Sequence, residues 1–156
     1  MQTIISLFLS ACLSAALYQF IAPMFSRGAV AFQPVSVGHK LLFGVAMSVT
    51  SQIVLMGLTL LASVTLVPLL VALGVTVTAT AAPTAAVIGL SIALLMTLLQ
   101  LANWVATMAL GRFMPSIIRV DSKAAAFKAA LAPTLVSGVF YVLMVFVLAP
   151  MMVVPS

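Results

Sequence analysis

The feature that most constrains this chain is a long run without any charged side chain, which extends from Leu41 to Gly111. Hydrophobic residues make up 65% of the 156 residues and charged residues only 4%, so a soluble fold would have almost nothing to expose to water. A helix that spans a membrane needs about 20 consecutive apolar residues, which limits the chain to about five or six spans. We therefore predict an all-α, polytopic membrane protein with a single transmembrane domain over residues 1–156.

Four apolar segments are long enough to cross about 30 Å of hydrocarbon at 1.5 Å per residue. They cover residues 3–25, 41–67, 85–110 and 131–154. The stretch from Gly74 to Thr84 is small, β-branched and interrupted by Pro83, which favours a loop and therefore two middle spans rather than three. Pro68 is expected to kink or end the second helix near Val67. The prediction is four transmembrane helices arranged as two hairpins.

The six basic residues all lie in two connectors, one within each hairpin. Arg27 and Lys40 are in the first connector, residues 26–40, and Arg112, Arg119, Lys123 and Lys128 are in the last, residues 111–130. Short loops rich in Lys and Arg stay in the cytoplasm, so both connectors are expected there, in a bacterial inner membrane with both termini on the periplasmic side. Two middle spans satisfy this rule and three would not. The same six side chains are expected to contact anionic lipid headgroups, and nucleic-acid binding is not expected, because this placement already accounts for the basic charge.

Polar side chains inside the predicted spans need partners there. Gln52 lies near the middle of the second span, and Gln100, Asn103 and Thr107 share one face of the third because they are spaced by three and four. We expect these faces to meet and to exchange hydrogen bonds between helices. The alternative is that they line a path for an ion or a small solute.

Small residues recur at intervals of four along the predicted helices, a spacing that lets membrane helices approach closely. The series are Ser6, Ser10 and Ser14 on the first helix, Gly44 and Ser48 on the second, Ala81, Ala85, Gly89 and Ala93 leading into the third, and Thr134 and Gly138 on the fourth. They indicate packing within one bundle or, alternatively, association with another subunit.

Residues suited to catalysis or metal binding are scarce. No Asp, Glu, Lys, Arg or His lies well inside a predicted span, unlike in proton relays and cation-coupled transporters. One His39 at a membrane edge and one distant Cys12 do not make a metal site. Leu9 to Cys12 matches the pattern of lipidated bacterial proteins, but no Lys or Arg precedes it and the apolar run continues, which favours an uncut helix. We expect no catalytic residue, no cofactor and no metal.

Asp121 is the only acidic residue of the chain. It precedes a strongly helix-forming run, Ser122 to Lys128, so its carboxylate can accept hydrogen bonds from the free amides of a first turn. We predict that Asp121 is the N-cap of a short interfacial helix that leads to Pro133 and the last span. A catalytic role is not expected, because His39 in the other connector is its one possible non-basic titratable partner.

These features favour a non-catalytic protein: a small integral membrane subunit, or an accessory or scaffold protein, of a larger inner-membrane assembly. It would act through helix packing and lipid contact, with identical or different transmembrane subunits as partners. An oligomeric channel, a holin-like pore or a small-solute facilitator is the first alternative. In layout, each half also resembles the conjugative pilins of type IV secretion systems, which have two apolar helices, a basic cytoplasmic loop and both termini outside. That resemblance implies a subunit of a secretion or conjugation machine.

Overall fold

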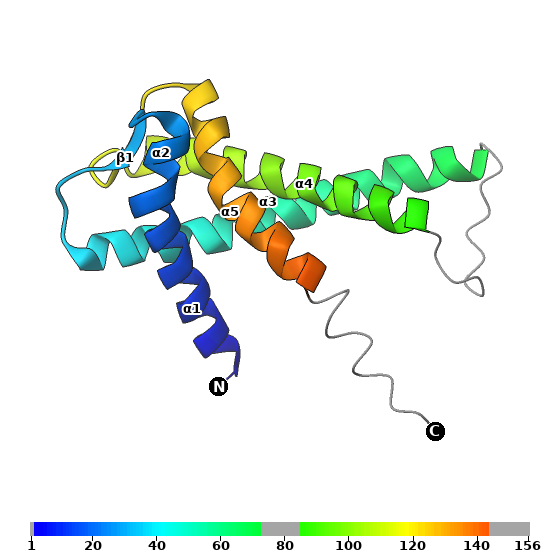
Figure 1. Cartoon of the computed structure of the whole chain (residues 1–156), viewed down its shortest axis with the longest axis horizontal. Coiled ribbons are helices and arrows are strands. Elements are labelled where there is room, and N and C mark those ends of the chain that lie inside the picture. Colours follow the sequence, from blue (N-terminus) through cyan, green and yellow to red (C-terminus); the bar gives the residue numbers. More distant parts are fainter. Residues whose placement is uncertain (1, 73–84, 144–156) are drawn as a thin grey trace.

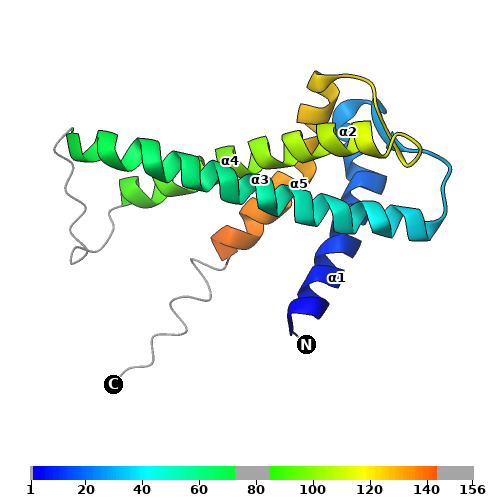
Figure 2. The ribbon, with the colours of Figure 1, turned by 180° about the vertical axis from the view of Figure 1, so that it is seen from behind.

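The computed structural model describes residues 2–72 and 85–143, and this part of the chain is mostly helical, as predicted. Its helices are α1 (Gln2–Ala16), α2 (Ala22–Ser26), α3 (Val37–Ala72), α4 (Ala85–Phe113) and α5 (Lys123–Leu143), with a π-helical segment η1 (Leu17–Ile21) that joins α1 to α2. The strands are β1 (Val30–Phe32) and β2 (Ile118–Val120). Two views show α3 and α4 as a long antiparallel pair, which α1 and α5 cross near one end (Figures 1 and 2).

Three helical stretches are long and apolar enough to cross a membrane, which is consistent with an integral membrane protein. They are Phe8–Ser26, Val37–Thr65 and Gly89–Phe113, among the described residues. These stretches coincide with three of the four predicted spans. The fourth predicted span, 131–154, continues beyond the described residues, and the predicted loop at 74–84 lies wholly outside them. Four spans and two hairpins therefore stay predictions.

The continuous helix formed by α1, η1 and α2 ends at Ser26. The amide of Gly28 donates to the carbonyl of Pro23 over 2.7 Å and that of Arg27 donates to Met24 over 3.4 Å, the paired bonds that close a helix in a Schellman motif. Arg27, the first residue after the helix, takes the positive φ that this motif places there, 54°, and Gly28 follows with a φ of 79°. Ser26 then receives the amide of Val30 at its hydroxyl over 3.1 Å. The turn feeds the chain directly into β1.

A small antiparallel sheet joins the two basic connectors. β1 pairs with β2 so that Val30 lies opposite Val120 and Phe32 opposite Ile118. Bonds on both sides extend the pairing, from the Gln33 amide to the Ile117 carbonyl over 2.9 Å and from the Asp121 amide to the Ala29 carbonyl over 3.0 Å. The all-α prediction was wrong on this point, because strands of three residues are too short to show a periodicity. The sheet places both connectors at the same end of the structure.

The core lies beneath this sheet. Its largest fully buried side chains are Tyr18, Val30, Phe43, Met47, Thr107 and Ile118, which come from η1, both strands, α3 and α4. The ring of Phe43 meets Tyr18 edge-on at 5.2 Å between centroids and Phe32 at 5.1 Å. Such edge-to-face pairs add to the burial of the rings. The main hydrophobic core therefore lies at the end of the structure where the two connectors pair, which we call the connectors' end.

Two prolines lie inside helices where the sequence predicted breaks. The sequence predicted a kink or an end near Val67; α3 continues through Pro68 to Ala72, so it does not end there. α5 continues through Pro133 to Leu143, so the predicted short interfacial helix and the start of the last span are one helix. A proline removes one intrahelical hydrogen bond, and membrane helices tolerate this where neighbouring groups or local adjustment compensate.

Ser122, not Asp121, caps α5. The hydroxyl of Ser122 accepts the amide of Ala125 over 3.1 Å, and its carbonyl accepts the amide of Ala126 over 3.0 Å. Asp121 is still part of the sheet through its bond to Ala29, and its Oδ1 lies 3.1 Å from Nε of Arg119. The predicted N-cap is thus one residue too early, since strand pairing and the ion pair hold Asp121 away from the helix end.

Ser122→Ala should destabilise the first turn of α5 by about 1 kcal/mol, because it removes the cap. Asp121→Ala is the matched control on the neighbouring residue. It breaks an exposed ion pair and should cost less than about 1 kcal/mol. Hydrogen exchange of the α5 amides measures both effects, and a larger loss of protection in Asp121→Ala would restore Asp121 as the cap.

Candidate functional site

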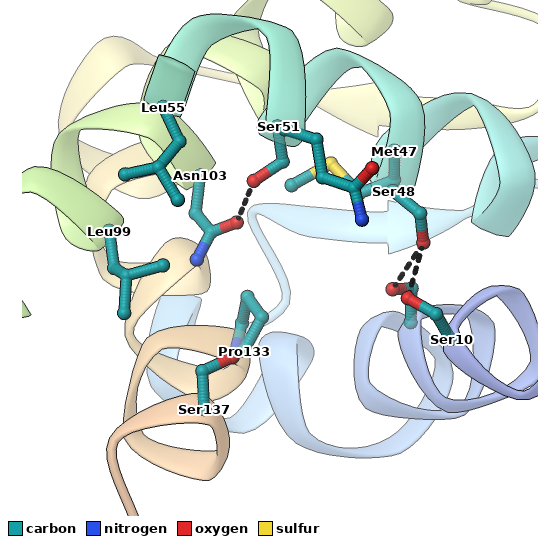
Figure 3. Close-up of a pocket in the computed structure, with 11 residues that line it drawn as sticks. Ser10, Met47, Ser48, Ser51, Leu55, Leu99, Asn103, Pro133 and Ser137 are labelled. Carbon is teal, nitrogen blue, oxygen red and sulfur yellow. Dashed lines mark hydrogen bonds between the residues drawn. The ribbon is translucent and has the colours of Figure 1, made fainter. Parts of the chain in front are cut away.

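A cavity of about 260 Å³ with polar and apolar walls lies where α1, α3, α4 and α5 meet (Figure 3). Its lining consists of Ser10, Ser14, Met47, Ser48, Ser51, Gln52, Leu55, Leu99, Asn103, Pro133 and Ser137. Seven of these eleven residues carry a hydroxyl or amide group and the other four are apolar, so the walls are mixed. All three candidate spans contribute to it. The cavity is the candidate functional site because polar groups within membrane helices are costly unless they serve packing or function.

Asn103 links three helices at this cavity. Its Oδ1 accepts a hydrogen bond from Ser51 on α3 over 2.7 Å, and its Nδ2 donates to Thr134 on α5 over 3.0 Å. The side chain is 5% exposed. Figure 3 shows the amide between Ser51 and the α5 wall. Asn103 thus has both ends of its amide satisfied by other helices.

Small residues let α1 approach α3 along another wall of the cavity. The hydroxyl of Ser48 lies 3.0 Å from that of Ser10 and 3.3 Å from that of Ser14. One turn earlier, a Cβ added to Gly44 would overlap the Ala11 carbonyl oxygen, so the two backbones are in direct contact. The series on the first and second helices therefore pack against each other within the chain.

The other two residues of the predicted polar face of α4, Gln100 and Thr107, are also buried. Thr107 is hydrogen-bonded to the hydroxyl of Tyr18, and both side chains are fully buried. Gln100 donates its Nε2 to the carbonyl of Phe127 over 2.8 Å. With Asn103, these residues form one polar face of α4 that meets α3, η1 and α5.

Gln52 lines the same cavity as Asn103 but does not form the predicted hydrogen bond with the polar face of α4. Ser51, and not Gln52, bonds to Asn103, because neighbouring residues on a helix point about 100° apart. Gln52 is exposed at the rim of the cavity, as is Ser137. Ser51, Tyr18 and Thr134 are the hydrogen-bond partners that the sequence alone did not identify. Each is an ordinary residue in an apolar helix, and only the helix rotations reveal them.

The six basic residues lie around the connectors' end. Arg27 follows α2, Lys40 is in the first turn of α3, Arg112 in the last turn of α4, Arg119 in β2, and Lys123 and Lys128 in the first turns of α5. Arg119 pairs with Asp121, and Nζ of Lys40 lies 5.7 Å from the ring centre of Phe32. Apart from Lys40, which is half-buried, all of them are exposed.

The chemistry that the cavity offers is hydrogen bonding. Hydroxyl and amide groups can hold a polar solute or a polar side chain of a neighbouring helix. A helical fold does not identify a function, because many unrelated proteins share it. The groups that line the cavity are therefore the better guide to function. Comparison with protein-family models, with curated proteins and with solved structures found no match for this chain.

Proposed function

We propose that this protein is a non-catalytic transmembrane subunit or scaffold of a larger inner-membrane assembly, in which a helix of another subunit covers the rim of the cavity. The observation that carries the proposal is the position of Gln52. Its side chain is exposed within the candidate span Val37–Thr65, whereas Asn103 across the cavity is buried and hydrogen-bonded. An exposed amide is costly in hydrocarbon, because lipid tails offer neither donors nor acceptors. A polar group of a partner helix would satisfy it.

The surface beyond Gln52 suits such a helix. Met56 and Leu60 follow Gln52 at intervals of four and are both exposed, so the three side chains form a stripe along α3. A partner that places a hydrogen-bonding group opposite Gln52 and apolar side chains opposite Met56 and Leu60 would match the stripe. Lipid alone would match its apolar part and leave the amide unsatisfied.

The same proposal includes the orientation. Four spans in two hairpins would place connectors 26–40 and 111–130 in the cytoplasm of a bacterial cell and both termini outside. The charge distribution supports this, as does the β1–β2 pairing that brings the two basic connectors together. A reporter fused to either terminus that proved cytoplasmic would overturn the orientation.

A photo-crosslinking side chain at position 52 tests the proposal in native membranes. We expect a discrete protein adduct from position 52, because the partner helix lies against it. Val64 on the same helix is also exposed and serves as the control position, from which we expect mainly lipid adducts. Only lipid adducts at both positions would contradict the proposal.

The mass of the adduct identifies the kind of assembly. An adduct of twice the chain mass indicates identical subunits, and a ladder of multiples indicates a polymer of the kind formed by pilin-like proteins. Any other protein mass indicates a different subunit.

A small-solute facilitator is the second candidate function, and the hydroxyl-lined cavity favours it. Flux of glycerol or urea into vesicles that contain the purified chain separates the two functions. Flux that Ser48→Leu abolishes would support the facilitator, whereas a protein adduct at position 52 without flux supports the subunit.

A further inference from the structure

A second cavity, of about 150 Å³, lies between the end of α4 and the start of α5. Its lining consists of Met108, Gly111, Arg112, Val120, Ser122 and Lys123. Gly111 lies directly against β2, since a Cβ on it would come within 2.6 Å of Cγ2 of Val120. This close approach brings Arg112, in the last turn of α4, and Lys123, the first residue of α5, to the same cavity. Two cations therefore line a small, partly enclosed space.

Neither cation has a carboxylate side chain of this chain available to it. Asp121 is the only acidic residue in the whole sequence, and its carboxylate is 3.1 Å from Arg119. The Ser122 hydroxyl accepts the amide of Ala125, which leaves its own hydrogen for an acceptor. An anion with several acceptor oxygens would satisfy all three groups, and a phosphate group has this chemistry.

The surroundings of the cavity indicate that the phosphate belongs to a lipid. Trp104 lies two turns before Arg112, and its Nε1 donates to the carbonyl of Lys123 over 3.0 Å. Tryptophan is enriched where membrane and water meet. Trp104, Met108 and Gly111 are spaced by four and three, so one apolar face of α4 leads from the cavity towards the middle of the span. A polar end beside an apolar track suits an amphiphile rather than a soluble anion.

We propose that this cavity binds the phosphate group of an anionic phospholipid between Arg112 and Lys123, with its acyl chain along Trp104 and Met108. Basic pockets between transmembrane helices bind anionic headgroups through this combination of charge and apolar contact. Only Arg112 and Lys123, of the six basic residues, line this site. It does not depend on the partner subunit proposed above.

Trp104 provides the test, because it is the only tryptophan in the chain. The full-length protein is reconstituted in phosphatidylcholine vesicles that contain either dibrominated phosphatidylglycerol or dibrominated phosphatidylcholine, whose bromines quench tryptophan on contact. We expect phosphatidylglycerol to quench Trp104 preferentially. Replacing Arg112 and Lys123 together by Gln should reduce this preference by more than about tenfold, since it removes both cations that line the cavity and each is worth about fivefold.

The matched control replaces Arg27 and Lys128 by Gln, which removes the same charge from positions outside the cavity and should lower the preference clearly less than the cavity variant does. Equal losses in the two double variants would mean that the charge acts only as a diffuse surface potential, and the site would be refuted. No preference in the wild-type protein would refute it as well.

Two further experiments test whether charge alone defines the site and whether its ligand is a lipid or a soluble anion. Arg112→Lys with Lys123→Arg keeps both charges and should retain the preference, so a loss there would contradict a charge-based site. Inorganic phosphate should not displace brominated phosphatidylglycerol. Displacement at equal concentration would show that the site takes a soluble anion and would overturn the lipid assignment.

Discussion

Gly44→Ala should lower the free energy of unfolding by about 1–3 kcal/mol or more, the largest effect that we expect from one added methyl group. The added Cβ would overlap the backbone carbonyl of Ala11 and lie 3.2 Å from Cβ of Ala15. A backbone cannot rotate away as a flexible side chain can, so α1 must move from α3. That movement would also break the bonds of Ser48 to Ser10 and Ser14. Thermal unfolding in a mild detergent, followed by the fluorescence of Trp104, measures the loss.

Gly57→Ala is the matched control because it makes the same change on the same helix. A Cβ on Gly57 would meet nothing within 4 Å. Alanine is the better helix former, so this variant should be neutral or more stable by about 0.5–1 kcal/mol. Equal stability of the two variants would show that α1 and α3 are not in the close contact described above.

Asn103→Leu should destabilise the isolated chain by about 1–2 kcal/mol, since it removes two interhelical hydrogen bonds of about 1 kcal/mol or less each. Leucine is similar in size, so the effect comes chiefly from the lost bonds to Ser51 and Thr134. The Ser51 hydroxyl, which donates to Asn103, would lose that acceptor. Unfolding of the purified protein in detergent is the measurement.

Gln52→Leu is the control for this experiment, and it should have the opposite profile. Gln52 is exposed, so its loss should change the stability of the isolated chain little. In native membranes, however, it should weaken association with the partner, which Asn103→Leu should leave intact where folding is preserved. Similar profiles for the two variants would contradict the separate roles of a buried link and an exposed contact.

Much of the helical layout was predictable. The predicted segments 3–25, 41–67 and 85–110 correspond to helical stretches that end at Ser26, Ala72 and Phe113 in the structure. Long apolar runs identify such helices because the membrane-crossing requirement is local and depends on length and hydropathy. The effect of the prolines was not predictable, since Pro68 and Pro133 both lie inside helices. A proline costs one hydrogen bond, and its neighbours determine whether the helix continues.

The candidate site was predictable only in part. The spacing of Gln100, Asn103 and Thr107 indicated one polar face, and the structure places all three on the buried side of α4. Their partners were not predictable, because they lie on other helices and depend on how each helix is rotated. Ser51 faces Asn103 while Gln52, one residue later, is exposed, a difference that composition cannot reveal.

The sequence by itself determined that the chain carries apolar helices of membrane length and that its charges gather in two connectors. Both properties depend only on the hydropathy and charge of residues close together in the sequence, so they can be predicted without knowing which helices contact each other. Only the tertiary structure decided that the connectors pair as β1 and β2, that Ser122 begins α5, and that Arg112 and Lys123 line one cavity. These are matters of register and rotation between segments far apart in the chain, where a shift of one residue turns a side chain to a different face.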